Sequence, residues 1–157
     1  MSCPADTSTQ LGTVTYGTVL VPLDGSHVAA EALPHAVEIA RRCNARLVLL
    51  HVTPETVGES APSREAQAHH SQTEAYFAGL RRSLQRYGVR VDCMIEGGSA
   101  ADTIAAVARN LDRPLIVVAQ SGRTAAHEDG DKSRVGSVTQ RLRVIWDGPL
   151  SLIKPVV

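Results

Sequence analysis

The amino-acid sequence predicts a doubly wound α/β domain, in which a parallel sheet of five strands carries helices on both faces. Five short runs of aliphatic and β-branched residues alternate with longer segments of helical periodicity. The short runs are continuously apolar, which is typical of strands that are buried from both sides. Because each connection is long enough for one helix, right-handed crossovers can join successive parallel strands. A chain that begins in the middle of such a sheet has the strand order 3-2-1-4-5.

The length and charge of the chain limit its function. Its 157 residues, 43% of them apolar, suit one domain, and we expect residues 1–16 to form a flexible tail and residues 17–157 to form the domain. Lys plus Arg and Asp plus Glu both number 16. This balance creates no basic field and argues against binding of nucleic acid or an anionic membrane.

Cysteine usage and hydropathy point to the cytoplasm. Cys3, Cys43 and Cys93 are odd in number and far apart, which favours reduced thiols over a disulfide framework. No apolar run approaches the length of about 18 residues that a membrane-spanning helix needs. No signal-peptide pattern opens the chain.

The apolar runs and the periodic segments give the expected elements. The predicted strands are Thr18 to Leu23, Arg46 to Val52, Val89 to Glu96, Leu115 to Ala119, and Leu150 to Lys154. Four helical stripes lie between them, formed by Ala30, Leu33, Val37 and Ala40; by Phe77, Leu80, Leu84 and Tyr87; by Ile104, Val107, Ala108 and Leu111; and by Val138, Leu142 and Ile145. Pro34 predicts a kink or a late start in the first helix. Gly88 and Gly148-Pro149 are expected to end the second and the last.

Two short sequences indicate where the last two helices begin. Residues 99–102 and 137–140 both have the form of a capping box, with a serine followed three positions later by an acidic or amide side chain. We therefore expect Ser99 and Ser137 to cap these helices.

The predicted topology locates a ligand site. In doubly wound sheets, small ligands bind beyond the carboxyl ends of the strands where the strand order reverses, here between the first and fourth strands. The segments that face this crevice are Pro22 to Ser26 and Ala119 to Ser137. The second contains a connection, residues 120–135, that is longer than most loops in such folds and is therefore functional or disordered.

Two features of these segments have a functional and a purely structural interpretation. Asp24 directly follows an apolar strand, in which a charged side chain has no packing role. Its carboxylate could accept a hydrogen bond from a ligand, or it could simply cap the next helix. Gly136 and Ser137 precede the last helix, whose free N–H groups and dipole could hold a phosphate, or they could form an ordinary turn and cap. Their position at the reversal point favours the functional interpretation for the second pair.

Several motifs resemble those of the universal stress protein family. They are VLVPLDGS at Val19 to Ser26, LLHV at Leu49 to Val52, EGGSAADTI at Glu96 to Ile104, and the pair Gly136-Ser137. The likeness extends from Tyr16 to Val157. It implies a flavodoxin-like fold, frequent homodimers and, in one branch of the family, binding of ATP in a stress-response regulator or sensor. Another branch binds no nucleotide and implies a dimeric protein-interaction module.

The resemblance also implies which residues hold ATP, with Mg²⁺ bound through the phosphates. Pro22, Leu23 and Asp24 would line the adenine and ribose side, the Val52 backbone would meet the adenine edge, and Val118 and Ala119 would close over the ribose. The phosphates would lie against Gly122, Gly136, Ser137 and Val138.

Two departures from the family's ATP pattern bear on this expectation. The pattern reads glycine, two residues, glycine, nine residues, glycine, then serine or threonine. Here Ala119 replaces the first glycine, and thirteen residues separate Gly122 from Gly136. We expect ATP binding that is weakened but survives, and that Ala119→Gly strengthens several-fold if glycine's conformational freedom is needed there.

The remaining motifs do not indicate an enzyme. The strings SGGxDS, HxGH, GxxxxGK[ST], GxGxxG and GxSxG do not occur. His69 and His70 are adjacent on a predicted helix and so point about 100° apart, which does not suit one metal ion. The apolar end of the chain, residues 150–157, would leave a sheet edge exposed, and we expect it to pair with a second copy in a homodimer.

Overall fold

The computed structural model describes residues 15–24, 27–53, 63–120 and 136–154, and of His27 and Val28 it describes the backbone alone. The elements alternate along the chain as the sequence predicts. In order they are β1 (Thr18–Pro22), α1 (His27–Ala30), α2 (Leu33–Cys43), β2 (Arg46–Thr53), α3 (Arg64–Gln85), β3 (Arg90–Gly97), α4 (Ala100–Arg109), β4 (Pro114–Ala119), α5 (Ser137–Ile145) and β5 (Leu150–Ile153).

The strands form one parallel sheet in the order β3-β2-β1-β4-β5, which confirms the predicted topology. Thr18 at the start of β1 lies opposite Arg46 of β2 on one side and Pro114 of β4 on the other. The amino ends of the central strands are therefore level. Their carboxyl ends meet at the same edge of the sheet, where the strand order reverses between β1 and β4.

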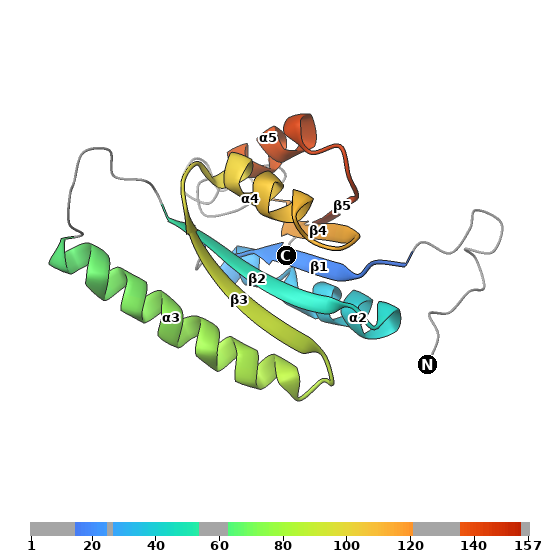
Figure 1. Cartoon of the computed structure of the whole chain (residues 1–157), viewed down its shortest axis with the longest axis horizontal. Coiled ribbons are helices and arrows are strands. Elements are labelled where there is room, and N and C mark those ends of the chain that lie inside the picture. Colours follow the sequence, from blue (N-terminus) through green and yellow to red (C-terminus); the bar gives the residue numbers. More distant parts are fainter. Residues whose placement is uncertain (1–14, 25–26, 54–62, 121–135, 155–157) are drawn as a thin grey trace.

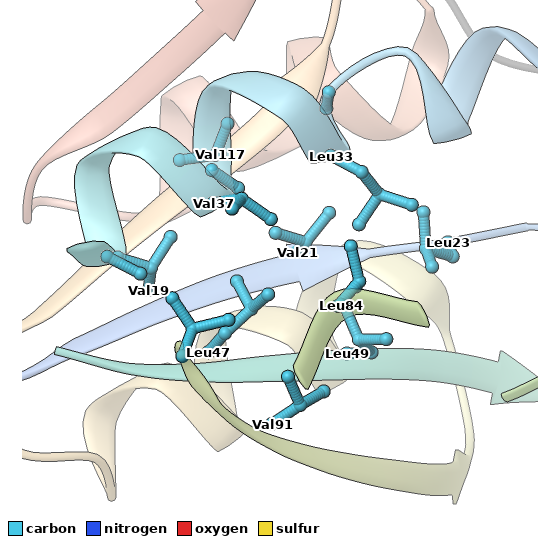
Figure 2. Close-up of a cluster of buried hydrophobic side chains, with 14 of the residues drawn as sticks. Val19, Val21, Leu23, Leu33, Val37, Leu47, Leu49, Leu84, Val91 and Val117 are labelled. Atoms are coloured by element: carbon cyan, nitrogen blue, oxygen red, sulfur yellow. The ribbon is translucent and has the colours of Figure 1, made fainter. Parts of the chain in front are cut away.

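Helices cover both faces of the sheet, and each face has its own hydrophobic core. In Figure 1, α2 and α3 lie on one side of the sheet and α4 and α5 on the other. Because successive side chains of a strand point to opposite faces, Val19 and Val21 of β1 enter the first core while Leu20 enters the second. Figure 2 shows the first core, where Val21 and Leu49 lie among helical side chains that include Leu33, Val37 and Leu84.

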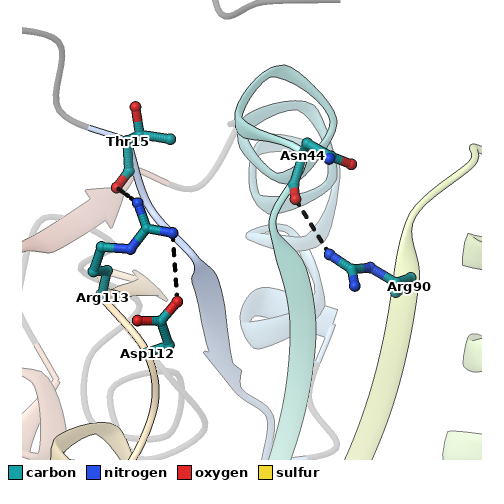
Figure 3. Close-up of polar contacts among 5 residues, drawn as sticks. All are labelled: Thr15, Asn44, Arg90, Asp112 and Arg113. Atoms are coloured by element: carbon teal, nitrogen blue, oxygen red, sulfur yellow. Dashed lines mark hydrogen bonds and ion pairs between the residues drawn. The ribbon is translucent and has the colours of Figure 1, made fainter.

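Polar contacts fix the amino edge of the sheet. Arg113, just before β4, donates from its guanidinium to the Thr15 carbonyl oxygen at 3.4 Å, and its other terminal nitrogen lies 3.4 Å from Asp112 Oδ2 (Figure 3). Arg90 donates to the carbonyl oxygen of Asn44 at 3.4 Å. These contacts lie at the opposite end of the sheet from the predicted ligand site.

The helix boundaries confirm one prediction about proline and correct another about the second helix. The chain forms α1 and then restarts as α2 with Pro34 in its first turn, so the predicted late start is confirmed. The helix α3 ends at Gln85, three residues before Gly88, whose φ of +81° turns the chain toward β3. Tyr87 therefore lies outside the helix and is 58% exposed, so its assignment to the inward stripe is wrong.

Both predicted capping boxes are wrong in detail. Ser99 is the N-cap of α4, but its side chain makes no capping hydrogen bond. Gly136 is the N-cap of α5, with extended φ and ψ of −63° and 154°, and Ser137 is already the first helical residue. Glycine can take a cap position without a side-chain partner. The helix also ends at Ile145, before Gly148 and Pro149.

Candidate nucleotide-binding cleft

A cavity of about 120 Å³ opens at the carboxyl edge of the sheet, between the ends of β1 and β4. It is lined by residues of all three central strands and of α1, α4 and α5. Its lining consists of Pro22, Leu23, Asp24, Ala29, Leu50, Val52, Ala100, Ile104, Val118, Ala119, Gly136, Ser137, Val138 and Thr139. This is the place that the strand order predicts for a ligand.

Backbone hydrogen bonds hold the strand ends that form the floor. Beyond the last residue of β1, Leu23 still donates to the Leu50 carbonyl oxygen at 2.8 Å. Asp24 follows directly and is half-buried. On the other side, Gln120 donates to the Ile153 carbonyl oxygen at 2.7 Å, which continues the pairing of β4 with β5.

The first turn of α5 supplies the polar wall. The backbone N–H of Gly136 donates to the Gln120 carbonyl oxygen at 2.9 Å, so the residues that bracket 121–135 are joined directly. The first bond within the helix runs from Gln140 N to Gly136 O at 2.9 Å. The N–H groups of the three residues before Gln140 precede this bond and project from the helix terminus, where the helix dipole is positive.

Thr139 ties α5 to the end of β4. Its hydroxyl donates to the Ala119 carbonyl oxygen at 3.3 Å, and its side chain is buried. The bond sets the first turn of α5 against the cavity wall that Val118 and Ala119 form.

The opposite wall is apolar. Leu50 and Val52 alternate along β2 and so face the same side as α4, where Ile104 completes the wall. A cavity of about 150 Å³ admits one benzene ring. The volume here thus suits a single planar apolar group, and a charged extension of the ligand would lie at the rim beside the α5 terminus.

The structure brings together nine of the ten residues predicted for the site: Pro22, Leu23, Asp24, Val52, Val118, Ala119, Gly136, Ser137 and Val138 all line this cavity. Gly122, the tenth, lies outside the described residues. Their contact with ATP stays a prediction.

Five lining residues were missed: Ala29, Leu50, Ala100, Ile104 and Thr139. The strand order indicates the loops at the reversal point, and it does not indicate which faces of the neighbouring elements line the cavity. The signal for Leu50 was present, because side chains two apart in a strand share a face and Val52 was already selected. For Ala100 and Ile104, the start of α4 would have to be placed over β2, which the sequence does not specify.

The described side chains that line the cavity are suited to binding a ligand, and few of them could act as an acid or a base. Among the described residues that line the cavity, Asp24 is the one with an ionisable side chain. Among the described residues, no group of three or more His, Cys, Asp or Glu side chains could hold a metal ion. Cys93 lies on the other face of the sheet, and burial raises the pKa of its thiol despite the lowering effect of Arg81, so the thiolate is disfavoured.

The fold and the cleft define a doubly wound α/β protein with a cavity at the carboxyl edge of its sheet. The universal stress protein family model matches residues 15–143, and the chain belongs to that family. Every helix in the described part of the chain is too short or too polar to cross a membrane.

Individual relatives agree with this assignment. A Staphylococcus haemolyticus protein described as a universal stress protein is 30% identical over 134 residues, covering 82% of this chain and 79% of the relative. Among solved structures, universal stress protein UspA from Lactobacillus plantarum is 24% identical, covers 90% of this chain and 99% of its own, and superimposes with a TM-score of 0.76.

Two further structures of the same fold contain nucleotides. A universal stress protein solved in complex with cAMP is 18% identical, with a TM-score of 0.65 over 88% of this chain and 97% of its own. The universal stress protein from Archaeoglobus fulgidus solved in complex with dAMP is 18% identical, with a TM-score of 0.64 over 90% of this chain and 100% of its own.

Proposed function

We propose that this chain binds an adenine nucleotide, ATP, in the cleft between β1, β4 and α5, and acts as a regulator or sensor in a stress response. The observation that carries the proposal is one cavity that combines an apolar wall with the amino terminus of α5, whose N-cap makes no side-chain hydrogen bond. An apolar cavity alone would accept many ligands, whereas a helix terminus beside it adds a preference for an anionic group.

The chemistry of the two walls orients the nucleotide. The adenine would lie against Val52 and Ile104, and Asp24 would accept a hydrogen bond from the ribose or the exocyclic amine. The phosphates would then reach the first turn of α5, where Gly136 has no side chain and Ser137 is exposed. Mg²⁺ would be held through the phosphates, because the described lining offers a single carboxylate.

Relatives support the ligand class. The structures solved with cAMP and with dAMP share this fold and carry an adenine nucleotide. Both ligands are monophosphates, so the length of the phosphate chain is the part of the proposal that needs its own measurement.

One observation removes an objection to ATP. Ala119 stands where the ATP-binding pattern has glycine, but it is not one of the residues with positive φ, which among non-glycine residues are Asn44 and Arg113. An alanine with ordinary backbone angles needs none of glycine's freedom. The strain considered from the sequence therefore has no structural basis at this position.

The second candidate is a dimeric interaction module that binds no nucleotide. It is favoured by the departures at Ala119 and in the spacing between Gly122 and Gly136. In both readings we propose a homodimer through β5, because this strand has a neighbour in the described sheet on one side only.

Native mass spectrometry of the freshly purified protein, followed by calorimetry with Mg-ATP, Mg-GTP and adenosine, separates the two functions. We expect Mg-ATP to bind and Mg-GTP to bind at least about tenfold more weakly, a difference of about 1.4 kcal/mol. An absence of adenine-nucleotide binding at millimolar concentration would leave the interaction module as the function.

A further inference from the structure

A second cavity, of about 150 Å³, lies on the opposite side of β2 from the cleft. In β2, Leu50 and Val52 face the cleft, so His51 between them faces the α3 side. The cavity is lined by Asp24, His51, His69, Gln72, Thr73, Tyr76 and Phe77. Asp24 borders both cavities, and none of the other lining residues belongs to the cleft.

Aromatic rings are concentrated in this second cavity. The ring centroids of His51 and His69 are 5.9 Å apart, those of His51 and Phe77 are 6.2 Å apart with the rings nearly perpendicular, and those of Tyr76 and Phe77 are 6.0 Å apart. The whole chain contains one Phe, one Trp and three Tyr. Two of these five rings, together with two imidazoles, therefore line one small cavity.

The hydrogen bonds fix the chemical character of His51. Its Nδ1 lies 2.9 Å from the Leu23 carbonyl oxygen, and because a carbonyl can only accept, Nδ1 carries the hydrogen. In the neutral imidazole, Nε2 is then an acceptor. Within the described part of the chain, no partner of Nε2 is found.

The other polar groups of the described lining carry one negative charge and no fixed positive charge. The Thr73 hydroxyl donates to the His69 carbonyl oxygen at 2.9 Å, so its hydrogen is already used. Asp24 contributes a carboxylate, the Gln72 amide and the Tyr76 hydroxyl are neutral groups that can both donate and accept, and the described lining contains neither Lys nor Arg. This lining therefore favours a ligand that brings positive charge together with hydrogen-bond donors.

We propose that this cavity is a binding site for a small organic ammonium ion whose apolar body is about the size of one ring. The ammonium group would donate to the Asp24 carboxylate and to His51 Nε2, in charge-assisted hydrogen bonds. The body would pack against Phe77 and Tyr76, whose ring faces attract a cation. The site shares Asp24 with the proposed nucleotide site, but it does not require a bound nucleotide.

The test uses benzylammonium as the probe, with benzyl alcohol and benzoate as neutral and anionic compounds of similar size. Calorimetric or NMR titration of the full chain is done without nucleotide at about pH 8, where free imidazole is neutral. We expect saturable binding of benzylammonium, and binding at least about tenfold weaker for the other two, because a charged hydrogen bond contributes at least that factor. Equal affinity for benzylammonium and benzyl alcohol would overturn the proposal.

Variants assign the binding to this cavity. His51→Phe keeps a ring and removes the Nε2 acceptor, and we expect it to weaken benzylammonium about tenfold. His70→Phe is the matched control, since His70 lies next to His69 on α3 but pairs with Glu74 at 3.3 Å and does not line the cavity. If His51→Phe fails to fold, His51→Leu serves in its place, with folding checked by circular dichroism. No saturable binding below about 10 mM, or equal affinity in His51→Phe and His70→Phe, would contradict the assignment.

The two proposals can fail separately. Benzylammonium is titrated without nucleotide, so a chain that binds no ATP still reports on the second cavity. Conversely, a chain that binds Mg-ATP and does not discriminate benzylammonium retains the proposed function and loses this one. Asp24 borders both cavities, and for that reason His51 is the residue used to distinguish them.

Discussion

Asp24 and Ser137 face the cleft from opposite sides. Asp24 follows the end of β1, and Ser137 opens α5. In the proposed complex, the two would therefore contact different parts of the nucleotide, Asp24 the base or ribose and Ser137 the phosphates. The structure is consistent with this division, since Gly136 is the N-cap of α5 and Ser137 is the first helical residue, so the cap position does not use the Ser137 hydroxyl.

Removing each of these two side chains should change the affinities for ATP and adenosine in a different way. We expect Asp24→Ala to weaken both ATP and adenosine, and Ser137→Ala to weaken ATP alone, each by about 1 to 3 kcal/mol. Calorimetry with both ligands on both variants measures this. Equal losses for ATP and adenosine in Ser137→Ala would mean that the ligand lies the other way round.

A substitution at Ala119 tests whether this position limits the affinity for ATP. Its backbone is ordinary and its side chain is 9% exposed at the cavity wall. We now expect Ala119→Gly to change the Kd for ATP by less than about threefold, in place of the several-fold gain that strain would have produced. A gain of tenfold or more would show that the methyl group obstructs the ligand.

At the scale of elements, the turn between α5 and β5 depends on Gly148. A Cβ atom there would collide with Cζ2 of the Trp146 indole and lie 2.7 Å from Cε2. The indole is held by a hydrogen bond from its Nε1 to the Pro149 carbonyl oxygen at 3.0 Å. The ring therefore has to move before any side chain fits at position 148.

Gly148→Ala should lower the free energy of unfolding by about 1 to 3 kcal/mol, the usual cost of overpacking. Gly79→Ala is the control, since nothing lies within 4 Å of a Cβ atom at this position inside α3. It should raise the free energy by about 0.5 to 1 kcal/mol. Urea unfolding followed by the fluorescence of Trp146, the one tryptophan, measures both. Equal effects of the two substitutions would contradict the packing argument.

The order of elements was predictable because it depends on periodicity alone. Continuous apolar runs separated by helical stripes gave every strand, and Pro34 gave the break between α1 and α2. The ends of helices were less predictable, since a cap depends on local backbone angles. Gly136 adopts the extended angles of the N-cap, and the serine next to it, which the motif favoured, became helical.

The parts of the cleft that depend only on the strand order were predicted from the sequence. The ends of β1 and β4 and the start of α5 follow from the strand order, and the structure brings their predicted residues together. Ala100 and Ile104 were missed because the packing of α4 across β2 is a tertiary contact, which the sequence pattern does not specify. The second cavity was missed for the same reason, since His51 and His69 come from β2 and α3 and meet only when the helix packs on the strand.

At the scale of the whole molecule, the proposed homodimer depends on the exposed sheet edge at β5. The bonds from Ile116 N to Pro149 O and from Gln120 N to Ile153 O, at 3.2 and 2.7 Å, direct the backbone of residues 149 and 153 toward β4. By alternation, the N–H and C=O groups of Leu150 and Leu152 point away from the sheet. This is the row of groups that a second copy would pair with.

We expect the full chain to run as a dimer and Leu152→Pro to run as a monomer, because proline removes one outward N–H group. Leu152→Ala is the matched control, since it loses the same side-chain packing but keeps the backbone donor. Size-exclusion chromatography with light scattering gives the masses, and circular dichroism checks the fold. A dimer that persists in a folded Leu152→Pro variant would place the interface elsewhere.

We expect the free energy of local unfolding to differ between α3 and the central strand β1. Of its 22 residues, Thr73, Phe77 and Leu84 are buried, and it lies over the edge strand β3 (Figure 1). With so few anchors, we expect α3 to detach at a lower free energy than β1, which is buried along nearly its whole length and should open only with global unfolding. In native-state hydrogen exchange, the amides of α3 should therefore lose protection at lower denaturant concentration than those of β1. The same event frees Cys93, whose Sγ lies 3.7 Å from the Phe77 carbonyl oxygen, so thiol labelling would report the lifting of this helix from the sheet.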